Sequence, residues 1–319
     1  MNSGAGSALQ QKGHVPLLPV RALSSRCNGD KVSHLQSRFH SDNTLKKRNN
    51  GKGVNQMNNI PEGTITREIR GHVFLIGIHR ASKMNAFTWD MLCDLSVAFG
   101  EYEVNDGLRC AVVYAAGEHF SSGLDLADVA PHVSVGEPYF KGGGIDPWGV
   151  HGPMLSKPLM MAVQGRCYTL GTELSLAADI VVAADNTRFA QLEVKRGIFP
   201  FGGATIRLPK TAGWGNAMRY LLTGDEFSAQ DAYRFGLVQE ITEPGQQLEK
   251  AMEIACKIAA QAPLAVQATL YLARSAANEG FQNGTKNIMP ELLKIMKTED
   301  AAEGVMSFIE RRPANFKGR

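Results

Sequence analysis

Long hydrophobic runs are missing from this sequence. Its 319 residues contain no stretch of about 18 or more consecutive apolar residues, so we expect no transmembrane helix. With 44% hydrophobic and 20% charged residues, the composition is typical of a soluble globular protein. The length suffices for one large domain with a sizeable core, or for two small domains.

Cysteine and histidine are sparse, and neither is clustered. The eight histidines are dispersed, and no Cys-x-x-Cys or Cys/His ligand spacing occurs. This pattern predicts a reducing compartment, no structural zinc and no metal site. The five cysteines are Cys27, Cys93, Cys110, Cys167 and Cys256.

Excess charge is confined to the N-terminal segment. Residues 1–59 carry nine basic and two acidic side chains, a balance of +7, whereas the whole chain carries +3 and residues 60–319 therefore carry −4. The body has no basic surface typical of nucleic-acid binding, so we expect no nucleic-acid partner.

Residues 1–59 are rich in Ser, Asn, Arg and Lys, and they lack apolar periodicity. Such a segment cannot bury enough apolar surface to offset its ordering entropy, so we predict a disordered basic extension. It is either an organellar transit peptide or an inert extension preceding a biological start at Met57. The protein is accordingly expected in the cytoplasm, or in the mitochondrial matrix if the segment is a transit peptide.

The remaining pattern predicts an α/β fold followed by helices. Residues 64–70 and 73–78 form a predicted hairpin, Thr88 caps a helix to about residue 105, and residues 110–115 form a buried strand. Residues 131–152, rich in Gly and Pro with Tyr139, Phe140 and Trp148, suggest a mobile flap near a ligand. After Gly203 the pattern is helical, with predicted helices at residues 204–209, 213–222, 228–235, 246–261, 263–278, 287–297 and 301–309.

The stretch from residue 162 to residue 203 organises the chain. Two apolar runs, residues 160–163 and 180–184, predict buried strands with a short helix at residues 173–178 between them. Glu173 and Glu193 each follow a strand and a turn, where α/β folds tend to place their sites. Glu173 has apolar neighbours, whereas the residues around Glu193, including a basic pair, alone indicate an exposed helix position.

Four stretches together resemble the crotonase superfamily, specifically the enoyl-CoA hydratases and their relatives, from about residue 64 to residue 317. The resemblance implies an α/β, crotonase-like spiral of ββα units at residues 60–240 and a C-terminal helical subdomain at residues 241–319. It also implies a CoA-thioester substrate and assembly as trimers or pairs of trimers. The stretches are HRASKMNA at residues 79–86, FSSGLDL at residues 120–126, residues 162–203, and FIERRPANFK at residues 308–317.

The resemblance also assigns site residues. The amides of Leu124 and Leu170 would form an oxyanion hole, because each lies at a loop that opens a helix and enolate chemistry needs donors at the developing charge. Many relatives have three glycines where this chain has Thr169-Leu170-Gly171. Glu173 and Glu193 match the two acid/base glutamates, and the retention of both favours hydration. For CoA, the resemblance points to Arg80 or Lys83, to the backbone at Asp125, Leu126 and Ala127, and to Phe308 and Arg311. A solvated helix face is an equally good interpretation of Arg311, and Asp125 and Asp179 are predicted to be structural.

We therefore expect an enoyl-CoA hydratase that adds water to a 2-enoyl-CoA and needs no metal or redox cofactor. An isomerase, hydrolase or decarboxylase acting on CoA thioesters is the alternative within the superfamily. A non-catalytic acyl-CoA-binding protein is the alternative from another class.

Overall fold

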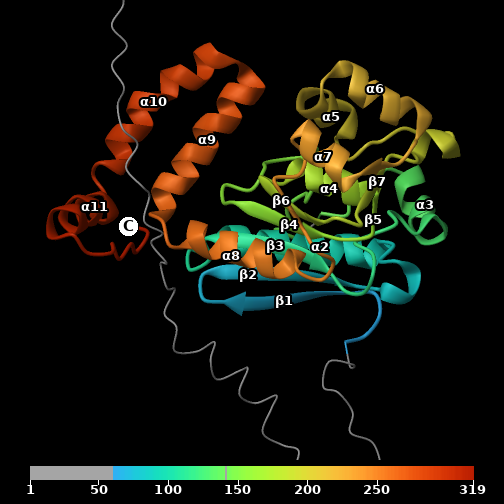
Figure 1. The fold of residues 1–319 in the computed structure, drawn as a ribbon, viewed down its shortest axis with the longest axis horizontal. Coiled ribbons are helices and arrows are strands. Elements are labelled where there is room, and N and C mark those ends of the chain that lie inside the picture. The colour runs from blue at the N-terminus through green and yellow to red at the C-terminus, as the bar shows by residue number, and fades with distance from the viewer. Residues whose placement is uncertain (1–59, 141) are drawn as a thin grey trace, which may run out of the picture. The chain divides into compact units, whose positions relative to one another are not determined.

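The computed structural model describes residues 60–140 and 142–319, and all of them belong to one compact unit (Figure 1). The expectations for residues 1–59 lie outside the described residues. None of the described helices is long and apolar enough to cross a membrane.

The main sheet has the order β1-β2-β3-β4-β6-β9. Only β1 runs antiparallel to its neighbour β2, as the predicted hairpin requires, and the other pairs are parallel. The short, half-buried β9 was not predicted, because three residues with two polar side chains show no strand periodicity. The strands are β1 (Thr64–Arg70), β2 (Val73–His79), β3 (Cys110–Ala115), β4 (Leu159–Val163), β6 (Ile180–Ala184) and β9 (Glu240–Thr242).

Helices cover both faces of this sheet (Figure 1). Helix α2 (Trp89–Val104), capped by the Thr88 hydroxyl, packs in one apolar cluster with alternate residues of β2 and β3, such as Ile76 and Val113. The intervening residues, such as Leu75 and Val112, face α8 (Gln247–Ala259). Because both faces are covered, the parallel strands are continuous apolar runs, which is why the sequence revealed them.

A second, three-stranded sheet has the order β5-β7-β8. Its strands β5 (Arg166–Tyr168), β7 (Arg188–Ala190) and β8 (Phe227–Ser228) were not predicted, because two or three residues are too few to show a period. Helix α4 (Leu170–Ala177) follows β5, and the 3-10 helix η3 (Glu193–Arg196) follows β7.

The helices after Gly203 agree broadly with the prediction, but α10 begins at Phe281 rather than at residue 287. Gly284 explains this early part of α10: a Cβ there would lie 2.6 Å from the Cβ of Ala276, so the glycine lets α10 pack closely on α9. The helices not yet given bounds are η2 (Ala81–Lys83), α3 (Leu126–Ser134), α5 (Ala204–Ala212), α6 (Trp214–Thr223), α7 (Ala229–Phe235), α9 (Pro263–Glu279), α10 (Phe281–Ile295) and α11 (Glu299–Glu310).

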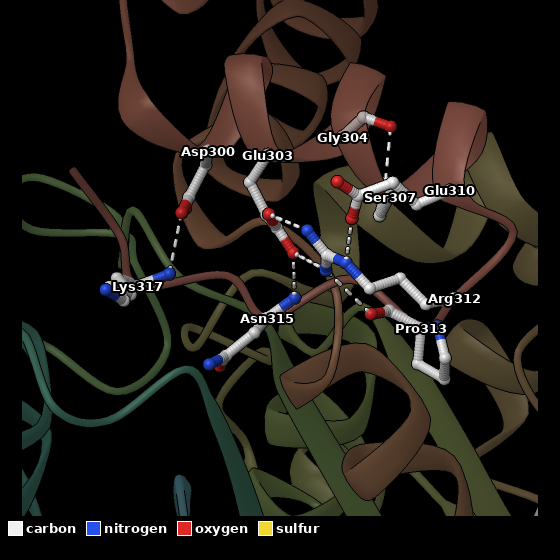
Figure 2. Close-up of polar contacts among 9 residues, drawn as sticks. All are labelled: Asp300, Glu303, Gly304, Ser307, Glu310, Arg312, Pro313, Asn315 and Lys317. Carbon is white, nitrogen blue, oxygen red and sulfur yellow. Dashed lines mark hydrogen bonds and ion pairs between the residues drawn. The ribbon is translucent and has the colours of Figure 1, made fainter.

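The C-terminal segment folds back along α11 (Figure 2). The Arg312 guanidinium donates to both carboxylate oxygens of Glu303, and the amide of Asn315 donates to the same carboxylate at 2.8 Å. The amide of Lys317 donates to Asp300 at 2.6 Å, and Asp300 is buried. These contacts fix the end of α11, where Phe308 and Arg311 lie.

A buried lysine closes the C-terminal end of α2. The Lys157 ammonium, 3% exposed, donates to the carbonyls of Tyr102 and of Asn105 and lies 4.6 Å from the centroid of the Tyr102 ring. A helix leaves its last four carbonyls without partners, so this side chain supplies donors that the helix itself cannot.

Lys157→Met keeps the apolar stem but removes these donors. We expect the free energy of unfolding to fall by about 1–3 kcal/mol, the usual effect of leaving buried acceptors unpaired. Urea denaturation measures this change. Lys294→Met, which breaks an exposed helical pair with Glu291, is the matched control and should leave the midpoint nearly unchanged. Equal midpoints for the two variants would show that Lys157 does not stabilise this helix end.

Candidate active site

The pairing of β5 with β7 brings the two candidate glutamates to one edge. These strands are parallel, with Tyr168 opposite Ala190, so their carboxyl ends meet. Glu173 lies in the first turn of the helix after β5, and Glu193 opens the 3-10 helix after β7. Both glutamates therefore follow the carboxyl ends of two neighbouring strands.

Glu173 is 1% exposed and held by one backbone donor. The amide of Ala204 donates to its Oε1 at 3.0 Å, while Oε2 has no hydrogen-bond partner within the described part of the chain. Burial raises the pKa of Glu173 to about 8, with a further contribution from the charge of Glu193 and an opposing one from the Ala204 amide. A buried carboxylate with a free oxygen is able to bind a water molecule or a substrate proton.

Gly202 supports Glu173 by its lack of a side chain. A Cβ at this position would lie 2.6 Å from Oε2 of Glu173 and 2.9 Å from Cδ2 of Leu170, so any larger residue would displace the carboxylate. This role was not predicted from the sequence. The Gly202-Gly203 pair was the signal that could have indicated a close approach of the backbone to another group.

Glu193 is 6% exposed, so the exposed position that its neighbours indicated is wrong. The 3-10 helix turns Glu193 inward and leaves Lys195 and Arg196 outside. Buried Gln191, with its amide nitrogen facing the carboxylate, donates to both oxygens of Glu193 at 3.0 and 2.9 Å. Burial raises the pKa of Glu193 to about 7. Gln191 was not identified from the sequence as a partner of Glu193.

The two carboxyl groups can supply a general acid and a general base together. Burial raises the pKa values of both groups toward neutrality, so a protonated and an ionised carboxyl group can be present together near neutral pH. A site that needs one general acid and one general base has both available near neutral pH.

The amides of Leu124 and Leu170 have no hydrogen-bond acceptor within residues 60–140 and 142–319. The amide of Phe87 donates to the carbonyl of Gly123, and the amide of Asp125 donates to that of Phe87, both at 2.8 Å. In this parallel bridge the amide of Leu124 points away from Phe87. Leu170 is the first residue of α4, whose first amides have no acceptor within the helix.

Thr169 and Gly123 join the two loops that carry these amides. Thr169 has φ 48° and ψ −116°, a conformation that favours glycine, which explains why glycine suits this position. A Cβ on Gly123 would lie 1.8 Å from Oγ1 of Thr169, so the close contact requires glycine on one side. Thr169 therefore adopts, despite its side chain, a backbone conformation that a glycine would adopt more readily.

An apolar cavity of about 280 Å³ lies beside Leu124 and Leu170. Leu124, Leu170 and Gly202 lie in its wall, and most of its other lining residues come from α2, α3 and the segment predicted to be a flap. Trp89, a major wall residue, was not singled out from the sequence. These other lining residues are Trp89, Leu92, Val129, Val133, Gly136, Glu137, Pro138, Tyr139, Phe140, Trp148, Val150, His151 and Phe201.

The residues expected to bind CoA fall into two groups. Arg80 pairs with Asp125 at 2.9 Å and also donates to the carbonyl of Ala86, and this guanidinium holds the pKa of Asp125 below its usual range. Lys83 on η2 and Leu126 and Ala127 at the start of α3 are exposed near these residues in the chain.

Phe308 and Arg311 lie on and after α11, which is at the opposite end of the molecule from α3 (Figure 1). Neither lines the cavity, so their CoA-binding role stays a prediction. Asp179 accepts from the amide of Leu159 at 2.9 Å and from Arg274 at 2.7 Å, in line with the structural role expected.

Comparison with known proteins identifies the family to which this chain belongs. The model of the enoyl-CoA hydratase/isomerase family matches residues 68–319. The chain belongs to this family of the crotonase superfamily, and its α/β fold is the crotonase fold.

Individual relatives cover most of the chain. A crystal structure of a probable enoyl-CoA hydratase/isomerase from Mycobacterium abscessus is 50% identical, with a TM-score of 0.79, and covers 81% of this chain and 100% of its own. Enoyl-CoA hydratase EchA19 of Mycobacterium tuberculosis is 33% identical over 81% of this chain and 97% of its own length. A carnitinyl-CoA dehydratase from Salmonella typhi is 33% identical over 74% and 92%, respectively.

The raised pKa of Glu173 predicts a pH-dependent loss of stability. A carboxyl group that binds its proton more tightly in the folded state stabilises the fold fully below its ordinary pKa of 4.5, and this contribution is lost as the pH rises through about 8. Glu173→Gln removes the buried charge. At pH 9 the free energy of unfolding of this variant should therefore be about 2–4 kcal/mol higher than that of the parent protein.

Thermal unfolding of both proteins between pH 5 and pH 9 measures this difference, which should shrink toward pH 5. Glu243→Gln, at an exposed turn, is the control and should follow the parent throughout. If the stability of Glu173→Gln differs from that of the parent by the same amount at every pH from 5 to 9, the pKa of Glu173 is not raised.

Proposed function

We propose that this protein is an enoyl-CoA hydratase, which adds water across the 2,3 double bond of a 2-enoyl-CoA to give a 3-hydroxyacyl-CoA. The observation that carries the proposal is the pair Glu173 and Glu193, both buried and with pKa values raised toward neutrality. Gly202, which contacts Glu173, also lines an apolar cavity. The names of two relatives, a hydratase and a dehydratase, support chemistry that adds or removes water.

The thioester oxygen would bind the amides of Leu124 and Leu170. Negative charge develops on this oxygen when water attacks C3, and fixed donors in an apolar site stabilise it strongly. The positive end of the α4 dipole, at Leu170, adds to this stabilisation. The acyl group would then occupy the cavity that both residues line.

The two carboxyl groups would divide the proton transfers. The ionised member takes a proton from the water that bonds to C3, and the protonated member gives its proton to C2, so the pair ends with its roles exchanged. The Oε2 of Glu173, which has no hydrogen-bond partner among the described residues, supports a water molecule held at this carboxyl group. No metal or redox cofactor is required for this addition.

For CoA, we propose that Lys83 and the exposed start of α3 contact the nucleotide or pantetheine part. Arg80, already paired with Asp125, supports this surface and retains donors for a phosphate. Phe308 and Arg311 would contribute only if a second chain brought α11 to the site.

We also propose a homo-oligomer, a trimer or a pair of trimers. The last three helices expose large apolar side chains, among them Phe281 (80%), Met289 (58%) and Phe308 (84%). Exposed apolar groups of this size on neighbouring helices are typical of a protein–protein interface.

Light scattering at micromolar concentration tests the assembly. The expected mass is three or six times the chain mass of 34.6 kDa. Phe308→Asp, which places a charge on this surface, should dissociate the particle, whereas Val104→Asp, at an exposed position 79% accessible on α2, should not. A monomeric parent protein overturns the proposal.

Glu173→Gln and Glu193→Gln test the chemistry. Gln keeps the shape and an acceptor oxygen but cannot exchange a proton, so each variant should bind substrate nearly normally and lose at least about a hundred-fold in the rate of crotonyl-CoA hydration. The double variant should be little slower than the slower single variant, because residues that act on one water act as a unit.

Absorbance at the enoyl-thioester band follows the rate, and Glu243→Gln is the control. If only one substitution matters, the isomerase or hydrolase alternative is favoured. If neither slows hydration, the hydratase proposal is wrong. Binding of acyl-CoA by the parent without turnover would favour the non-catalytic alternative.

A further inference from the structure

A buried carboxylate fixes the outer wall of the cavity. Asp146, 3% exposed, accepts hydrogen bonds at Oδ1 from the Tyr139 hydroxyl (2.5 Å) and the Trp148 amide (3.0 Å), and at Oδ2 from the amides of Val150 and His151 (both 2.8 Å). One side chain therefore holds two parts of the segment for which composition predicted a mobile flap. Four donors leave this carboxylate fully satisfied.

The same segment is pressed against α2. The amide of Ile145 donates to the carbonyl of Ser96 at 3.1 Å, and a Cβ on Gly100 would lie 2.3 Å from the carbonyl oxygen of Gly143. The wall cannot retreat from α2 without breaking these contacts and those of Asp146.

The wall itself consists of interlocked aromatic rings. Tyr139 meets Trp89, Phe140 and Trp148 edge to face, with centroid distances of 6.3, 5.3 and 5.7 Å. Trp148 is also bonded through its indole N–H to the carbonyl of Leu170 at 2.9 Å. Each ring is thus held by a neighbouring ring or a hydrogen bond.

The volume of the cavity limits its ligand. An apolar cavity of about 150 Å³ holds one benzene molecule, so a cavity of 280 Å³ holds about eleven non-hydrogen atoms of ligand. A long straight acyl chain exceeds this limit, whereas a phenyl ring on a three-carbon unit meets it. Aromatic walls also favour flat rings through offset and edge-to-face contacts.

We infer that the cavity selects compact, ring-bearing acyl groups and excludes long straight chains, with Tyr139 and Trp148 as specificity-determining residues and Asp146 as a positioning residue. This inference rests on the proposed function only in that the site binds an acyl-CoA. It concerns binding of the acyl group and not its hydration.

Tryptophan fluorescence tests the selection directly. Two of the three tryptophans, Trp89 and Trp148, line the cavity, whereas Trp214 on α6 is 72% exposed. In a Trp214→Phe protein, all tryptophan emission therefore comes from the cavity. The probes are saturated thioesters that cannot be hydrated: 3-phenylpropionyl-CoA, butyryl-CoA and dodecanoyl-CoA, with free CoA as the reference.

We expect 3-phenylpropionyl-CoA to bind at least about tenfold more tightly than butyryl-CoA or dodecanoyl-CoA. Dodecanoyl-CoA binding as tightly as the phenyl compound overturns the inference. Loss of hydration with this order intact would reject only the proposed reaction. Hydration of crotonyl-CoA with dodecanoyl-CoA bound most tightly would reject only the inference.

Two variants in the same background test the residues. Tyr139→Leu removes a wall ring, and Asp146→Asn weakens the acceptor for four donors, so both should reduce the preference for the phenyl compound over dodecanoyl-CoA by about tenfold. Free CoA should bind unchanged. Tyr233→Leu, at an exposed position on α7, is the matched control and should keep the full preference. If Asp146→Asn does not fold, Tyr139→Leu alone decides, and an unchanged preference in it overturns the assignment.

Discussion

The short parallel pairing of β5 with β7 is the constraint on which the site depends. It spans three residue pairs, yet it sets the starting points of α4 and of the 3-10 helix that carry Glu173 and Glu193. Because parallel strands end at the same edge, two carboxyl groups twenty residues apart in sequence come to share one apolar environment. Their pKa values are raised chiefly by this burial, which at Glu173 outweighs the opposing charge of Arg207.

The backbone does much of the positioning around this pair. Ala204 supplies an amide to Glu173, Gly202 supplies empty space, and the contact between Gly123 and Thr169 aligns the loops of the two free amides. Such features act through geometry rather than through side-chain chemistry. Gly202 and Gly123 leave no room for a side chain, whereas Thr169 keeps a φ of 48° through its surroundings.

Much of the fold could be predicted because its long elements carry periodic apolar patterns. Helix α2, with its Thr88 cap, and the buried strands β3, β4 and β6 are examples. The strands β5 and β7 could not be predicted, since three residues show no period, and the burial of Glu193 depends on them. The resemblance identified both glutamates, but Gln191 and Asp146 owe their roles to partners that only the folded chain brings together. A polar residue in sequence does not reveal whether its partners will be water or protein.

The hydrogen bond from the Trp148 indole to the carbonyl of Leu170 joins the wall of the cavity to the start of α4, whose Leu170 amide we propose as a donor to the thioester oxygen. Fit of the acyl group and stabilisation of developing charge are therefore mechanically linked. A ligand that pushes this indole outward also pulls on the first turn of α4. Discrimination between acyl groups would then be expressed in turnover as well as in affinity, and during evolution a change of acyl preference would require compensating changes near the start of α4.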